Sequence, residues 1–254
     1  MSSPISDVLA LRASLVPVDN LLGAWFIGLI ISSIIFGISC LQVYLYYTQH
    51  CARDGKFLKC FVAVLLVLDT LHLTLISISF YRDAVTNFGD FVQLNTVPWT
   101  LLAQTPVGVL LSTMIQLFYA YRIRTLSNGS PYMPVLIFVF SLVELALGVV
   151  YMHNGLQLKF FTRAREDLPF SASALASEVA CDVLITGSTI YYLLRNKSDF
   201  KATNRAINIL VAYTINSGAL SLFFAICTLI TCLTSTKTLI FAPFFFVLVR
   251  RESA

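Results

Sequence analysis

Long runs of apolar residues alternate with short polar segments along nearly the whole chain. A helix rises 1.5 Å per residue, so about 20 apolar residues cross a hydrocarbon core of about 30 Å. The pattern therefore predicts an all-α integral membrane helix bundle, with one membrane domain over residues 21–249. The predicted spans are 21–47, 57–81, 98–121, 132–152, 172–194, 206–229 and 230–249.

The last of these spans has the shortest apolar run. Leu239 to Val249 would form about 17 Å of helix, so it crosses a membrane only with residues from 230 onward. We favour a seventh span, and the alternative is six spans followed by a re-entrant or interfacial tail. Residues 1–20 are expected to lie outside, and residues 250–254 to form a short cytosolic tail.

The composition and the distribution of charge support this topology. Hydrophobic residues make up 57% of the chain and charged residues 12%, whereas soluble domains have about 25% charged residues. Although the net charge is +4, the basic residues lie in short loops, so we expect no nucleic-acid partner. Eleven Lys and Arg lie on loops one, three and five and the C-terminal tail, against six on the other side. The positive-inside rule then places the N-terminus outside and the C-terminus in the cytosol, in the plasma membrane or a secretory-pathway membrane.

The fifth loop is the most basic of these connections. It carries Arg195, Lys197, Lys201 and Arg205. Each Lys or Arg near an anionic leaflet gains about 1 kcal/mol, so we expect membrane lipids, anionic lipid in particular, as partners of the cytosolic loops. A role as topology signals alone explains these residues equally well.

Several polar residues interrupt the predicted spans near their centres. Asp69 and His72 lie three residues apart, and Glu178 and Asp182 lie four apart, so each pair shares one helix face. Counted from the predicted span ends, Asp69 and Glu144 lie about 18 Å deep, and Asp182 and Asn216 about 15 Å. The candidate binding residues, as one buried polar cluster, are Asp69, His72, Glu144, Glu178, Asp182 and Asn216.

Two interpretations of this cluster are open. Polar groups at membrane depth usually face protein or a water-filled cavity. Two carboxylates one turn apart in a low dielectric should not both be ionised, so we expect at least one to hold a proton. A hydrogen-bonded structural knot between helices is the favoured interpretation. The other is a site for protons, a cation or a cationic ligand.

The remaining motifs argue against an enzyme. The histidines at 50, 72 and 153 are dispersed, which does not suit a metal centre, and no G-x-S-x-G motif occurs. We expect no cofactor and no metal. The favoured function is a non-enzymatic receptor-like or membrane-scaffold protein, and the alternative is a proton- or cation-linked transporter. A membrane-embedded hydrolase is a second, weaker alternative, and no internal repeat supports a transporter of the inverted-repeat type.

A set of short motifs is spread over most of the chain from about residue 20. They are Phe36-Gly37, Leu41-Gln42-Val43-Tyr44-Leu45-Tyr46-Tyr47, Leu68-Asp69-Thr70-Leu71-His72, Val85-Thr86-Asn87-Phe88-Gly89, Pro98-Trp99, Gln116-Leu117-Phe118-Tyr119-Ala120-Tyr121-Arg122, Tyr213-Thr214-Ile215-Asn216-Ser217-Gly218 and Phe244-Phe245-Phe246-Val247-Leu248. Taken together, they resemble a large family of multi-span membrane proteins of mushroom-forming fungi (basidiomycetes) whose function is unknown. The resemblance implies a membrane helix bundle and no particular chemistry. Members of such families usually continue into a longer cytosolic tail than residues 250–254.

Overall fold

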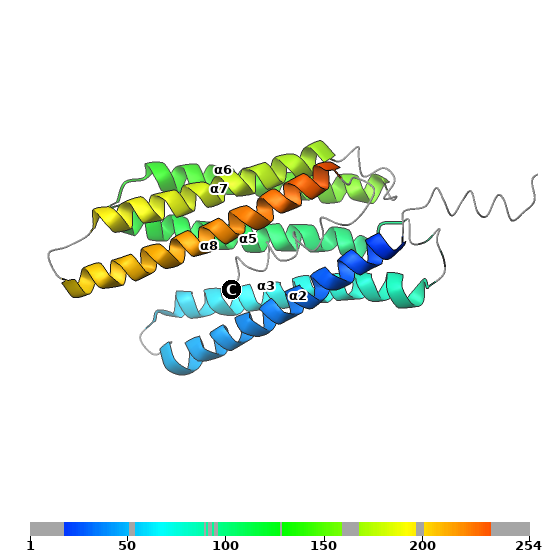
Figure 1. The fold of residues 1–254 in the computed structure, drawn as a ribbon, viewed down its shortest axis with the longest axis horizontal. Helices are drawn as coiled ribbons and strands as arrows, with labels where there is room; N and C mark the ends of the chain where they lie inside the picture. Colours follow the sequence, from blue (N-terminus) through cyan, green and yellow to red (C-terminus); the bar gives the residue numbers. More distant parts are fainter. Residues whose placement is uncertain are drawn as a thin grey trace, which may run out of the picture.

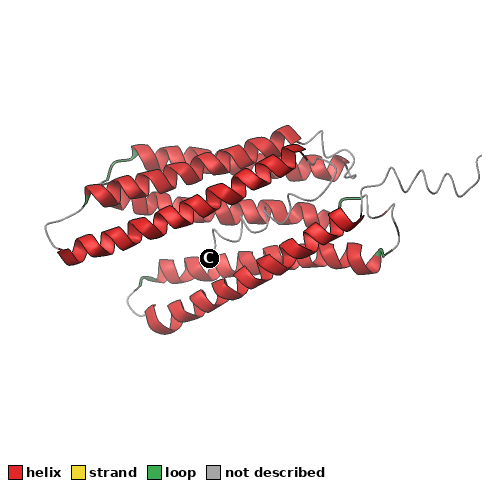
Figure 2. Cartoon of the chain, in the orientation of Figure 1, coloured by secondary structure: helices red, strands yellow, loops and turns green. Residues whose placement is uncertain are grey.

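The structure, a computed structural model, describes residues 18–50, 54–88, 90, 93, 96–127, 129–158, 168–196 and 201–234. Within these ranges the regular elements are helices (Figure 2). This confirms the predicted helical fold, and six of the described helices are long and apolar enough to cross a membrane. Residues 1–17, the tail 250–254 and most of the predicted seventh span lie outside the described residues.

The helices follow the predicted spans closely. They are α2 (Val18–Leu45), α3 (Lys56–Tyr81), α5 (Trp99–Leu126), α6 (Tyr132–Leu158), α7 (Leu168–Arg195) and α8 (Lys201–Thr234). Two π-helical segments, η1 (Tyr46–His50) and η3 (Arg82–Thr86), continue α2 and α3. Several helices continue beyond the predicted ends of their spans. In particular, α8 continues to Thr234, so residues 230–234, which we assigned to the seventh span, belong to the sixth helix.

The bundle consists of two groups of helices joined by α5. In Figure 1, α2 and α3 lie together on one side and α6, α7 and α8 on the other, with α5 between them. The packing agrees with this view: α2 packs against α3 and α8 packs against α7, while α5 packs against α3, α6 and α7. Helix α5 is therefore the shared element of the bundle.

The close contact between α5 and α6 depends on glycines of α6. A Cβ atom on Gly155 would lie 2.5 Å from Leu102 Cδ2, and one on Gly148 would lie 3.0 Å from Val109 Cγ2. Small residues at helix interfaces allow two backbones to approach closely in a membrane, where packing rather than the hydrophobic effect holds helices together. This approach buries much of α5, whose inward positions are mainly small or polar.

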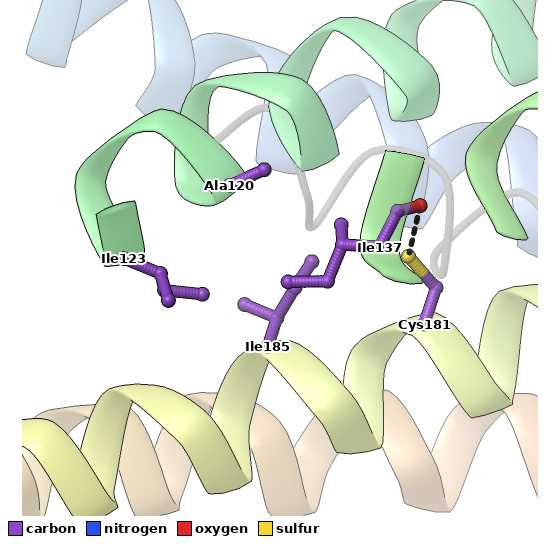
Figure 3. Packing of buried hydrophobic residues seen from close by; sticks show 5 residues of the cluster. All are labelled: Ala120, Ile123, Ile137, Cys181 and Ile185. Carbon is purple, nitrogen blue, oxygen red and sulfur yellow. Dashed lines mark hydrogen bonds between the residues drawn. The ribbon is translucent and has the colours of Figure 1, made fainter. Parts of the chain in front are cut away.

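An apolar cluster fills the space between α5, α6 and α7 towards the Leu126 end of α5. It consists of Ala120 and Ile123 from α5, Ile137 from α6, and Cys181 and Ile185 from α7 (Figure 3). The Cys181 thiol points to the Ile137 carbonyl, with Sγ and O 3.9 Å apart. Cys181 is therefore a buried packing residue.

Aromatic rings hold the α2–α3 pair together. The ring of Trp25 meets that of Phe80 edge-on with centroids 6.0 Å apart, and Phe26 stacks on Phe80 at 5.6 Å. Near the opposite end of α3, Phe61 stacks on Phe118 of α5 at 5.3 Å. These contacts set how far α3 is shifted lengthwise against its two neighbours.

Candidate functional site

The buried face of α3 is mostly polar. Its buried residues are Asp69, His72, Ile76 and Ser79, and Asp83 follows in η3. Steps of three and four residues place all five on one helix face. Asp69 is 1% exposed and His72 is fully buried. The predicted pair thus faces protein rather than lipid.

Helix α5 supplies hydrogen-bond partners for this face. The His72 imidazole Nε2–H donates to Gln104 Oε1 at 2.6 Å, and the Gln104 amide Nε2 donates to Thr105 Oγ1 at 3.3 Å. One to two turns further along α3, the hydroxyls of Ser79 and Thr100 are hydrogen-bonded to each other. We call His72, Gln104, Ser79 and Thr100 the α3–α5 contact.

A second polar centre lies between α5, α6 and α7. The Gln116 amide Nε2 donates to Glu144 Oε2 at 2.9 Å and to Ser112 Oγ at 3.1 Å. Ser112 and Glu144 thus share the Gln116 amide, and Asp182 is close enough to act on Glu144 electrostatically. We call Ser112, Gln116, Glu144 and Asp182 the α5–α7 centre.

The α5–α7 centre has an acidic neighbour on α7. Glu178 is buried one turn before the half-buried Asp182. The apolar cluster of Figure 3 lies next to the centre, because Ala120 follows Gln116 by one turn on α5. The structure therefore brings Glu144 and Asp182 close together, beside an apolar part of the bundle.

The predicted residues do not form one cluster. His72 and Glu144 bind Gln104 and Gln116, which are twelve residues apart on α5, or about 18 Å along its axis. The expectation of a common level was wrong because depths were counted from the ends of the spans. Those ends are staggered: Phe61 packs at Phe118, near Gln116, while Asp69 lies eight residues further along α3.

Asn216 belongs to neither the α3–α5 contact nor the α5–α7 centre, because its side chain is exposed. The buried polar and small residues of α8, Ser221, Ala225 and Thr228, occupy the face towards α7. At 100° per residue, Asn216 lies between 120° and 180° from each of them. Its depth was predicted from the sequence, but depth does not determine which face of a helix a residue occupies.

Two further candidate site residues, Gln104 and Gln116, were not among those predicted from the sequence. Both interrupt the third span, and both are at most 4% exposed. An amide inside an apolar span is a polar group that needs a partner, so the signal was present in the sequence. The sequence did not show that the His72 imidazole and the Glu144 carboxyl group would each bind a glutamine amide of α5.

The α3–α5 contact and the α5–α7 centre contain imidazole, amide, hydroxyl and carboxyl groups. Among the described residues, no group of three His, Cys, Asp or Glu side chains is placed to hold a metal ion. The α3–α5 contact consists of hydrogen bonds, so it can join α3 to α5 and can break again when the helices move. The α5–α7 centre brings a second carboxyl group close to a buried one, so a proton or a cation would be stabilised there.

Comparison with protein families gives a match over the C-terminal part of the chain. A family of unknown function (DUF6534) matches residues 178–251, a segment that begins at Glu178 on α7 and includes α8. The match supports the predicted resemblance to a family of unknown function over this part of the chain. Neither the curated proteins nor the solved structures gave a match.

Proposed function

We propose that the protein is a non-enzymatic, receptor-like membrane protein in which α5 couples the α2–α3 pair to the α6–α8 group. The observation that carries this proposal is the position of α5, which packs against α3 on one side and against α6 and α7 on the other. A stimulus that moves α3 would reach α6 and α7 through this helix.

The polar contacts of α5 support this proposal because they are divided between its two halves. Gln104 binds α3 near one end of α5, and Gln116 binds α6 towards the other. Each contact is a small number of hydrogen bonds, and a hydrogen bond contributes about 0.5–1.5 kcal/mol, or about 1.5–3 kcal/mol where one group is charged. Contacts of this strength allow two arrangements of the helices to lie close in free energy.

Pro106 lies between these two contacts, inside α5. Proline has no N–H, so the hydrogen bond that would join residue 106 to the Leu102 carbonyl is missing. A helix bends most easily where its hydrogen-bond ladder is interrupted. Pro106 is thus the natural hinge of α5, between the hydrogen bond of Gln104 to α3 and that of Gln116 to α6.

A proton- or cation-linked transporter is the second candidate. One observation favours it: Glu144 is 2% exposed and has Asp182 beside it. Ionisable groups inside a membrane mark proton or ion pathways in many transporters. The hydrogen bond of Gln116 to Glu144 favours the structural interpretation instead.

We expect the two candidates to differ in reconstituted vesicles. Protein in liposomes that contain a pH-sensitive dye should give no proton flux above empty liposomes under an imposed pH gradient.

Spin labels at Cys60 on α3 and at Tyr191→Cys on α7, in a background without other cysteines, should show two distance populations. Pro106→Ala should reduce these to one. Proton flux that Glu144→Gln abolishes would establish the transporter instead, and a single distance population in both proteins would establish a static scaffold.

We also propose a seventh span over the run Leu239–Val249, with the N-terminus outside and the C-terminus in the cytosol of a plasma or secretory-pathway membrane. The basic loops support this orientation. An N-terminal epitope tag should be labelled in intact cells, and a C-terminal tag only after permeabilisation. The sequons at Asn128 and Asn196 should carry no glycan. Labelling of both tags in intact cells would mean six spans, and a glycan on either loop would mean the inverse orientation.

A further inference from the structure

Asp83 is a buried carboxyl group at the end of α3. It is 1% exposed, and neither of its carboxyl oxygens has a hydrogen-bond partner. The neighbouring Arg82 acts on it through its charge and is itself half-buried. Buried polar groups in proteins are nearly always satisfied, and an unsatisfied one often marks the place of a missing ion, water or ligand.

The helix face of Asp83 shows where its side chain points. At about 100° per residue, Asp83 lies between the directions of Ser79 and Phe80. Ser79 is bonded to Thr100 of α5, and Phe80 packs against Trp25 and Phe26 of α2. Asp83 therefore points into the corner between α2 and α5, next to the aromatic contact.

Two hydrogen-bond donors at the same end of the α2–α3 pair are also unsatisfied. Trp25 is fully buried, and its indole Nε1–H has no hydrogen-bond partner. The amide Nδ2 of Asn87 is also buried and has no hydrogen-bond partner. Asn87 closes the π-turn of η3, since its backbone N–H donates to the Arg82 carbonyl at 2.9 Å. Helical turns of this type occur frequently at functional sites.

We propose that this corner, formed by Asp83, Trp25, Phe80 and Asn87, binds a small organic ammonium ion that also carries a hydrogen-bond acceptor. The inference rests on the proposed receptor-like function and names the class of its ligand. The carboxylate would take the ammonium N–H groups, and the indole and amide N–H groups would donate to the acceptor. The aromatic rings of Trp25 and Phe80 also attract a cation.

Other ligand classes fit this corner less well. A carboxylate repels an anion. A divalent metal ion needs several oxygen or nitrogen ligands from the protein or water, and Asp83 belongs to no such group among the described side chains. A small aromatic amine with a hydrogen-bond acceptor would pair its ammonium group with the carboxylate, accept from the N–H donors and pack its ring against the aromatic side chains.

Trp25 can report the binding directly, because the chain has two tryptophans and the other, Trp99, is 63% exposed. In Trp99→Phe protein in nanodiscs, the fluorescence of Trp25 is followed while 2-amino-1-phenylethanol is added. We expect a saturable change, and 1-phenylethanol, which lacks the amine, should not produce it. Asp83→Asn keeps the shape and removes the charge, so it should weaken the apparent affinity at least about tenfold. Asp90→Asn, which neutralises an exposed carboxyl group of the same connection, should bind like the parent.

Each other outcome overturns the site. An equal response in Asp83→Asn, or an equal response to the neutral alcohol, would mean partition of the ring into lipid. If Asp83→Asn changes the emission of Trp25 but the amine has no effect on either protein, the indole bonds directly to the carboxylate. If the emission responds to pH but not to the amine, Asp83 binds only a proton. The two proposals fail separately, since this measurement reports binding, and the flux and distance measurements report transport and motion.

Discussion

Gly218→Ala should be among the most destabilising single substitutions in the bundle. A Cβ atom at this position would lie 2.5 Å from Thr186 Oγ1, 2.6 Å from its Cγ2 and 3.1 Å from its Cβ. Threonine is branched at Cβ and restricted in χ1, so it cannot turn away as a longer side chain could. The methyl group must therefore push α8 off α7, and overpacking of this kind typically costs about 1–3 kcal/mol. Thermal unfolding in detergent measures the loss.

Gly187→Ala is the matched control for this substitution. Gly187 lies on α7, one residue from Thr186, and a Cβ atom there would meet nothing within 4 Å. Alanine has a higher helix propensity than glycine, so this variant should be neutral or more stable by up to about 1 kcal/mol. Thr186→Ala should restore much of the stability lost in Gly218→Ala. Equal melting temperatures for Gly218→Ala and Gly187→Ala would mean that α7 and α8 do not approach closely here.

The spans were predictable because a helix in a membrane must satisfy its own backbone and bury apolar side chains. The run from Tyr132, for example, predicted a helix that the structure begins at the same residue. The ends were less predictable: α6 continues to Leu158 and α8 begins at Lys201, because a helix can project beyond the apolar region. Hydropathy does not report where such a projection ends.

Which helices pack together was not predictable from these runs. The approach of α5 to α6 depends on Gly148 and Gly155, and that of α7 to α8 on Gly218. Small residues also occur on α2, where Gly28 and Ser32 are buried but Ser33 and Gly37 are exposed. Small residues occur on many faces of membrane helices, so their spacing alone does not identify an interface.

The candidate site was predicted in its parts rather than in its arrangement. Asp69, His72, Glu144 and Glu178 are buried, because an ionisable side chain on the lipid side is costly. Their division into two centres follows from the lengthwise shift between α3 and α6 along α5, which only tertiary packing determines. Asp83 was assigned to a loop because the apolar run ends at Tyr81, yet the π-turn of η3 continues the helix and buries it.

Gln116→Leu should destabilise the protein more than Gln104→Leu, although the two glutamines share one helix and are buried to a similar degree. Loss of Gln116 removes an N–H donor from the buried carboxyl group of Glu144. Loss of Gln104 removes an acceptor from an imidazole. At alkaline pH, where Glu144 is ionised, the Gln116 bond is to a charged group and contributes about 1.5–3 kcal/mol, against about 1 kcal/mol for neutral pairs. We therefore expect a difference of about 1 kcal/mol between the two variants, measured as free energies of unfolding in mixed micelles.

The double variant Gln116→Leu/Glu144→Leu distinguishes a hydrogen bond from simple packing. Removing both partners leaves no stranded polar group, and this can be nearly neutral when the volumes are similar. The double variant should thus be more stable than Gln116→Leu alone, and Glu144→Gln should be mild because an amide still fills the site. The alternative view, in which polar contacts between membrane helices contribute little because the unfolded state also finds partners, predicts additive losses in the double variant. We expect coupling rather than additivity, since Glu144 lies between three helices and is 2% exposed, so neither water nor lipid headgroups can replace Gln116.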